Sequence, residues 1–173
     1  MLKELLIDEL QDIYHAERQL VKALPKMAKA ANSSELKEAF RNHLTETQGQ
    51  VERLNQAFEL LGEKAKAKVC KGMQGLVEEG QETITDGKEK ENPIADLALI
   101  GAAQRVEHYE ISAYGTARTI AEQLGQDEVV QLLEQTLEEE KNADETLSKI
   151  AGPLLEESKN GDMKDADDEY AST

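Results

Sequence analysis

The segment AQRVEHYEISAYGTARTIAEQL, residues 103–124, carries the pattern on which the rest of the interpretation depends. Small and apolar residues return along it at steps of four and three, as they do on the buried face of an amphipathic helix. The positions of this lane are Ala103, Glu107, Glu110, Tyr114, Ala117, Ala121 and Leu124. Two glutamates therefore stand where apolar side chains are expected. The segment predicts a long helix that carries two carboxylates into the protein interior.

The composition of the whole chain is typical of an all-α protein. Its 173 residues include only three prolines and 3% aromatic residues, and Ala, Leu, Glu, Lys and Gln dominate. These residues favour helices, whereas strands are rich in β-branched and aromatic side chains. The length suits one domain with a sizeable core.

The charge and the cysteine content exclude several classes of function. A formal net charge of −16 repels phosphate groups, so we expect neither nucleic acid nor an anionic membrane as a partner. The single cysteine, Cys70, excludes an internal disulfide and any metal site built from several cysteines. No apolar run approaches the roughly 18 residues of a membrane span, and the first residues are already acidic. We therefore expect a cytoplasmic protein.

Apolar periodicity predicts four long helices, over residues 2–31, 34–61, 92–124 and 127–150. Pro25 should break or bend the first of them, and Gly62 and Gly125 are suitable C-terminal stops for the second and third. Residues 63–91 are richer in glycine and should hold a short amphipathic helix inside a long connection. Two antiparallel hairpins joined by one long crossover form a ferritin-like four-helix bundle.

The C-terminal segment differs from the rest in composition. Gly152 and Pro153 should end the fourth helix, and the residues from 156 onwards contain seven acids against two lysines. With almost nothing to bury, such a segment is expected to be disordered. We therefore predict a bundle domain over residues 1–152 and an acidic tail over residues 153–173.

Acids interrupt the apolar lanes of the other three helices as well. Glu17 lies in the lane of the first helix, Glu46 near that of the second, and Glu140 and Asp144 in that of the fourth. Glu17 and Glu46 lie at almost equal distances from the first turn, and Glu107 and Glu140 lie at similar distances from the second. Antiparallel pairing therefore brings each pair to a similar depth. Buried carboxylates that converge must keep protons or hold cations. A carboxylate cage of this kind suits iron or manganese and could hold two ions.

Four segments resemble those of the YciE/YciF family of small bacterial ferritin-like proteins linked to stress responses. They are YHAERQL at 14–20, HLTET at 43–47, VEHYEI at 106–111 and LEEEK at 137–141. The resemblance covers about residues 1–150 and implies a rubrerythrin-like bundle, a homodimer and a di-metal centre.

The metal pattern of rubrerythrin-type proteins matches this chain only in part. The resemblance implies ligand roles for Glu17, Glu46, Glu107, Glu110 and Glu140. The two histidines of that pattern fall on Gly49 and Ala143, and Gln50 and Asp144 follow one position later. The expected metal ligands, in a site of oxygen donors only, are Glu17, Glu46, Gln50, Glu107, Glu110, Glu140 and Asp144. Whether His43 or Tyr114 joins them stays open.

The residues leave more than one function open. The first is a metal-binding stress protein that handles peroxide, dioxygen or metal ions. The second is a non-catalytic bundle that has lost its metal and acts through dimerisation or a protein partner, which Gly49 and Ala143 favour. An iron-storage cage is less favoured, because the acidic tail and the resemblance point to a small oligomer. A helical adaptor unrelated to ferritins is also less favoured.

Overall fold

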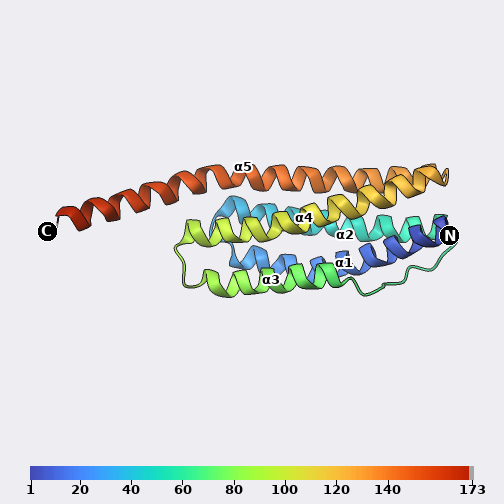
Figure 1. Cartoon of the computed structure of the whole chain (residues 1–173), viewed down its shortest axis with the longest axis horizontal. Coiled ribbons are helices and arrows are strands. Elements are labelled where there is room, and N and C mark those ends of the chain that lie inside the picture. Colours follow the sequence, from blue (N-terminus) through green and yellow to red (C-terminus); the bar gives the residue numbers. More distant parts are fainter. Residues whose placement is uncertain (172–173) are drawn as a thin grey trace.

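Five α-helices make up the computed structural model, which describes the backbone of residues 1–171 and the side chains of residues 1–159. The helices are α1 (Leu2–Ala30), α2 (Ser34–Leu60), α3 (Lys71–Gly87), α4 (Asn92–Gln123) and α5 (Asp127–Ala171). No strand occurs over residues 1–171. The all-α class, the two hairpins and the short helix in the crossover are as the sequence predicts (Figure 1).

Helices α1, α2, α4 and α5 form the bundle, and α3 covers one side of it. Around the bundle α1 packs on α2, α2 on α5, α5 on α4 and α4 on α1. After α2 the chain returns along the bundle as an extended segment, and α3 then packs against both α1 and α4 (Figure 1). This is the ferritin-like arrangement with one long crossover.

The turns between the helices follow the local sequence. Gly62 and Gly125 have φ values of 73° and 65°, which side chains other than glycine rarely adopt. Ser33 caps α2, because its Oγ accepts a hydrogen bond from the Leu36 backbone N–H at 3.4 Å. The two expected glycine stops are confirmed.

The first turn is also tied to α4 by a buried carboxylate. Asp96 accepts hydrogen bonds from the backbone N–H groups of Asn32 at 2.8 Å and Ser33 at 2.6 Å, and from the Asn32 side chain at 3.1 Å. These bonds satisfy backbone donors that the turn would otherwise leave without partners. They fix the end of the first hairpin against the second.

The expected ends of helices at prolines are wrong. Helix α1 is not broken at Pro25, which lies on the exposed face while Leu24 and Met27 are buried on the inner face; a bend at Pro25 stays a prediction. Helix α5 does not end before Gly152 and Pro153 but runs on to Ala171. Burial of Leu154 against the core extends the helix past Pro153. The domain boundary at residue 152 stays a prediction, and residues 172–173 of the expected tail lie outside the described residues.

The buried core of the bundle consists of two apolar clusters. One contains Leu6, Leu10, Phe58 and Leu133, and the other contains Leu24, Phe40, Leu99 and Leu147. Between them lies a layer of buried polar side chains from α1, α2, α4 and α5. Its members are Glu17, His43, Thr47, Gln50, Glu107, Glu110, Thr136 and Glu140. Every bundle helix thus contributes to one polar level, which we call the polar layer.

Candidate metal centre

Helix α4 brings two carboxylates to the polar layer. Glu107 and Glu110 are three residues apart, so both point from the same face of the helix. Both are buried, and neither oxygen of Glu110 has a hydrogen-bond partner among the described residues. The lane of residues 103–124 therefore has the buried orientation that the sequence predicts.

Helices α1 and α5 add one buried carboxylate each, and a neutral side chain orients each of them. The Tyr114 hydroxyl donates a hydrogen bond to Glu17 Oε1. The Gln50 amide donates one to Glu140 Oε1. In both residues the second carboxylate oxygen, Oε2, is buried and has no hydrogen-bond partner among the described residues.

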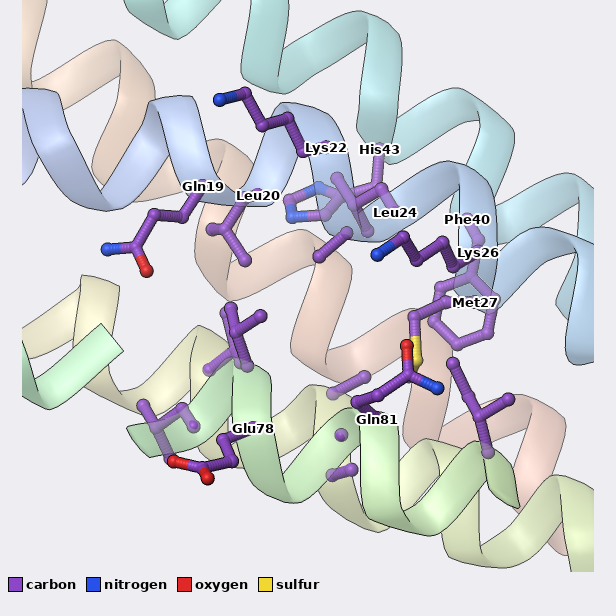
Figure 2. A pocket seen from close by; sticks show the side chains of 18 of the residues that line it. Gln19, Leu20, Lys22, Leu24, Lys26, Met27, Phe40, His43, Glu78 and Gln81 are labelled. Atoms are coloured by element: carbon purple, nitrogen blue, oxygen red, sulfur yellow. The ribbon is translucent and has the colours of Figure 1, made fainter. Parts of the chain in front are cut away.

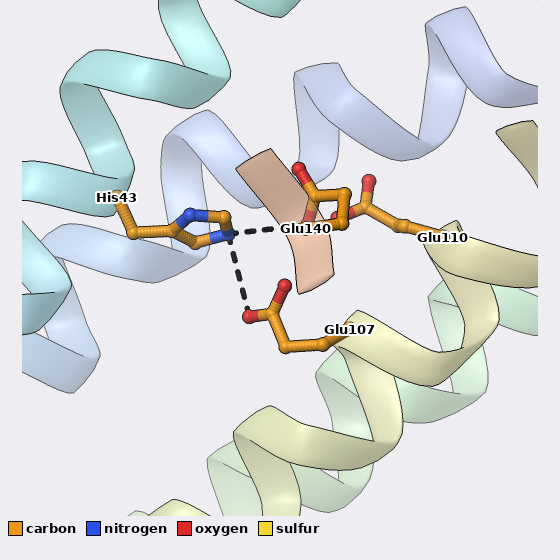
Figure 3. A group of neighbouring side chains, drawn as sticks. All are labelled: His43, Glu107, Glu110 and Glu140. Atoms are coloured by element: carbon orange, nitrogen blue, oxygen red, sulfur yellow. Dashed lines mark ion pairs between the residues drawn. The ribbon is translucent and has the colours of Figure 1, made fainter. Parts of the chain in front are cut away.

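Helix α2 contributes an imidazole (Figure 3). His43 Nε2 lies 3.3 Å from Glu107 Oε1 and 3.7 Å from Glu140 Oε2. On the other side of the ring, Nδ1 lies 3.2 Å from Glu46 Oε2. The sequence left the place of His43 open, and the structure brings it to the carboxylates.

Four residues come close enough to share one cation. Each of His43, Glu107, Glu110 and Glu140 offers a donor atom, and these atoms all lie within 4.8 Å of one another. Seven buried side-chain atoms without hydrogen-bond partners occur among the described residues, and all belong to the polar layer. They are Glu17 Oε2, His43 Nε2, Gln50 Oε1, Glu107 Oε2, Glu110 Oε1, Glu110 Oε2 and Glu140 Oε2. Buried polar atoms normally have partners, so this concentration fits a site built for a cation.

The pKa values of four residues in the polar layer are raised. Burial, followed by the negative charges of neighbouring carboxylates, raises the pKa of Glu17 and Glu110 well above 4.5. Burial also raises the pKa of Glu107 well above 4.5, together with its interaction with Glu140. For His43 burial acts in the opposite direction, but the hydrogen bond to Glu46 and the charge of Glu140 outweigh it and raise the pKa above 6.5. Without a cation the layer therefore holds protons.

Four of the expected ligands lie outside the four-residue group. Glu17 and Gln50 are buried beside it in the polar layer, whereas Glu46 and Asp144 are partly exposed. The Glu46 side chain is 44% exposed and touches the outer side of His43. The Asp144 side chain is 23% exposed, accepts a hydrogen bond from Gln104 at 3.0 Å and lies 3.3 Å from His108. Their roles as ligands stay predictions.

The expectation of oxygen donors only is wrong for the group that the structure assembles, because His43 supplies a nitrogen. The buried lane of α2 runs through Leu36, Phe40, His43, Thr47, Gln50, Leu54 and Ala57. It keeps the same steps of four and three as α4, which place Thr47 inside and turn Glu46 about 100° away. This regular lane was visible in the sequence, and following it would have found His43.

A charged cluster closes one edge of the layer, and sequence reasoning missed it. Arg53 pairs with Glu139, and its Nε donates a hydrogen bond to Thr136 Oγ1 at 3.0 Å. Glu139 Oε2 also accepts a hydrogen bond from Gln50 Nε2 at 3.2 Å. Arg53 thus holds Glu139, which accepts a hydrogen bond from Gln50, the residue that orients Glu140.

The chemistry of the donors suits a transition-metal ion. Carboxylates favour hard cations such as manganese, and imidazole adds affinity for iron. When His43 Nδ1–H donates a hydrogen bond to Glu46, Nε2 keeps a lone pair directed at Glu107 and Glu140. This is the arrangement of a histidine metal ligand supported by a carboxylate. The residues present therefore fit a metal ion, and Glu17 widens the site on the α1 side.

Comparisons with known proteins agree with this architecture. Residues 1–160 match the family described as Domain of unknown function (DUF892). The chain is 48% identical to Protein YciF of Escherichia coli (strain K12) over 151 residues, covering 87% of this chain and 90% of YciF. No helix within residues 1–171 is long and apolar enough to cross a membrane.

Solved structures of similar proteins have the same fold. The crystal structure of the E. coli stress protein YciF matches with a TM-score of 0.85 and 45% identity, covering 90% of this chain and 98% of that one. YcfI from Rhodopseudomonas palustris matches with a TM-score of 0.81 and 43% identity, covering 86% and 93%. The chain belongs to the DUF892 family, whose model matches residues 1–160, and it is similar to YciF in sequence and fold.

Proposed function

We propose that this protein is a stress-response protein that binds iron or manganese in the polar layer. The donors are Glu17, His43, Glu107, Glu110 and Glu140. The observation that carries the proposal concerns the side chains of residues 1–159: their buried polar atoms without hydrogen-bond partners all lie in this one layer. A pair of such ions would supply two-electron exchange with peroxide or dioxygen.

The surrounding residues prepare the donors for this role. Tyr114 and Gln50 hold one oxygen of Glu17 and of Glu140, so the second oxygen of each is free for a cation. Glu46 accepts a hydrogen bond from His43 Nδ1–H and so fixes the tautomer whose Nε2 can bind a metal. The two apolar clusters flank the layer and lower the local dielectric constant, which strengthens its electrostatic interactions.

Metal content tests the proposal directly. Protein produced with added iron or manganese should retain metal after desalting, measured by mass spectrometry and by anomalous scattering at the two absorption edges. Glu107→Ala and Glu140→Ala should each lose it, whereas Glu138→Ala, at an exposed position of α5, should not. Unchanged metal content in the first two variants would remove the proposed centre. Peroxide consumption is then compared in the metal-loaded protein and in Glu107→Ala.

A second candidate is a bundle without catalytic activity. Gly49 and Ala143 stand where the rubrerythrin-type pattern has histidines, and the raised pKa values of three glutamates let protons replace a cation. Metal-free protein from metal-replete cells, without peroxide turnover, would favour this candidate. A homodimer, measured by sedimentation, and a cytoplasmic location are part of both proposals.

A further inference from the structure

A cavity of about 440 Å³ lies beside the polar layer. Helices α1, α3 and α4 enclose it, and Phe40 and His43 reach it from α2 (Figure 2). Its volume is within the range of about 300–1,000 Å³ that is typical of small-molecule sites. The cavity exists because the crossover helix α3 covers the groove between α1 and α4 without filling it.

The walls of the cavity are mostly apolar. They include Leu20, Leu24, Met27, Phe40, Ile84 and Val106. Gly80, on the inner face of α3, is itself buried, yet a Cβ atom placed on it would meet no other atom within 4 Å. The space in front of Gly80 is therefore open, and an apolar chain could occupy it.

The inner end of the cavity is formed by two residues of the candidate metal centre. Both His43 and Glu107 line it. His43 Nε2 and Glu107 Oε2 are among the buried atoms that have no hydrogen-bond partner within the described part of the chain. A molecule in the cavity would therefore have one end at the proposed metal ligands.

The outer end carries positive charge. Lys22 and Lys26 stand on successive turns of α1, line the cavity and are exposed. Figure 2 shows the Lys26 ammonium turned toward α3 and the Lys22 side chain extending along the outer side of α1. Neither forms an ion pair with another residue whose side chain the structure describes. Opposite them, α3 presents Glu78 and Gln81. Two lysines against one glutamate leave an excess of positive charge at this end of an apolar cavity, on a chain of net charge −16, and this excess favours an anionic head group.

We propose that the cavity binds a linear aliphatic carboxylate. Its carboxylate pairs with Lys22 and Lys26, and its alkyl chain lies along the apolar walls with the methyl end toward His43 and Glu107. Binding itself requires no metal; only the role of this ligand as a substrate of the metal centre rests on the proposed function. The structure thereby assigns a substrate class to that centre.

The first test is binding of fatty acids to the full chain. Displacement of a dansyl-labelled undecanoic acid reports affinity for octanoate, decanoate and dodecanoate. Each added methylene should tighten binding about threefold to fourfold until the cavity is full. Dodecanol and dodecylamine have the same chain length without the negative charge, and they should bind less tightly than dodecanoate. Absence of saturable displacement, or equal affinity for the amine and the carboxylate, would overturn the proposal.

Two variants with matched controls locate the site. Gly80→Leu fills the cavity and also raises helix propensity, so it should fold and should weaken dodecanoate binding at least tenfold. Gly75→Leu, on the exposed face of the same helix, should leave binding unchanged. Lys22→Glu with Lys26→Glu should weaken dodecanoate binding several-fold but not dodecanol binding, and Lys29→Glu should do neither. Dodecanoate binding that Gly80→Leu leaves intact would place the ligand elsewhere.

Two further measurements separate this proposal from its alternatives. Sedimentation of Gly80→Leu should match that of the unmodified protein; loss of a dimer together with fatty-acid binding would make the cavity an interface between copies and overturn the proposal. Metal content should be the same in Gly80→Leu as in the unmodified protein. Dodecanoate binding in a protein that never holds metal would support the ligand site and refute its link to the metal centre.

Discussion

Replacing Glu110 with glutamine separates the stability of the bundle from the binding of metal. Glu110 is buried in the polar layer, and neither of its oxygens has a hydrogen-bond partner among the described residues. Glutamine keeps the size of the side chain, removes the charge and adds an amide that can donate hydrogen bonds to neighbouring carboxylates. We expect the metal-free variant to be more stable than the metal-free protein, although it loses a proposed ligand.

The magnitude follows from the spacing of the donor atoms. The nearest donor atoms of Glu107, Glu110 and Glu140 lie within 4.8 Å of one another. Two like unit charges at that separation repel by about 3 kcal/mol at an effective dielectric constant of about 20. Protonation relieves part of this repulsion, because the pKa of Glu110 is raised by burial and by its charged neighbours. A net gain of about 2 kcal/mol is therefore expected near neutral pH and above.

Thermal unfolding followed by circular dichroism measures both effects. For a chain of this length, 2 kcal/mol corresponds to a rise in Tm of roughly 4–8 °C in the presence of a chelator. With manganese added, the unmodified protein should gain stability in proportion to its affinity, and Glu110→Gln should lose most of that gain. Glu122→Gln, on the exposed surface of the same helix, should change the Tm little in either condition. A lower Tm of metal-free Glu110→Gln would refute the electrostatic argument.

Three other outcomes follow from the same structure. Folding raises the pKa values of three buried glutamates and of His43. The metal-free protein should therefore lose stability as the pH rises from about 4.5 through those raised values. Urea unfolding at a series of pH values measures this loss, and a rise in stability over that range would contradict it. Asp96→Ala removes the acceptor of three hydrogen bonds and should lower the free energy of unfolding by about 3 kcal/mol, with metal content unchanged by mass spectrometry. Tyr114→Phe leaves Glu17 Oε1 without its donor and should cost about 1 kcal/mol of stability and weaken manganese binding in a calorimetric titration; unchanged affinity would show that Glu17 needs no such orientation.

The sequence predicted the fold and much of the polar layer because both depend on helical periodicity. Regular steps of four and three placed Glu107 and Glu110 inside α4, and symmetry about the turns brought Glu17 and Glu140 to the same level. These inferences needed only the geometry of antiparallel helices.

The failures have local physical causes. In α2 a difference of one residue decides which side chain is buried: Thr47 is buried, whereas Glu46, to which the family resemblance gives a ligand role, is partly exposed. At Pro153 the burial of Leu154 outweighed the usual tendency of proline to end a helix. The cavity beside His43 depends on how closely α3 approaches α1 and α4, which residue spacing along one helix does not determine.

The division of the core by the polar layer has a consequence for folding. Each apolar cluster can form and open with its own part of the helices, and only the charged level between them joins the two ends of the bundle. An ion held there by all four helices would make the ends unfold as one cooperative unit. Native-state hydrogen exchange would then report a single protected block when the ion is present, and two blocks of different protection when a chelator has removed it.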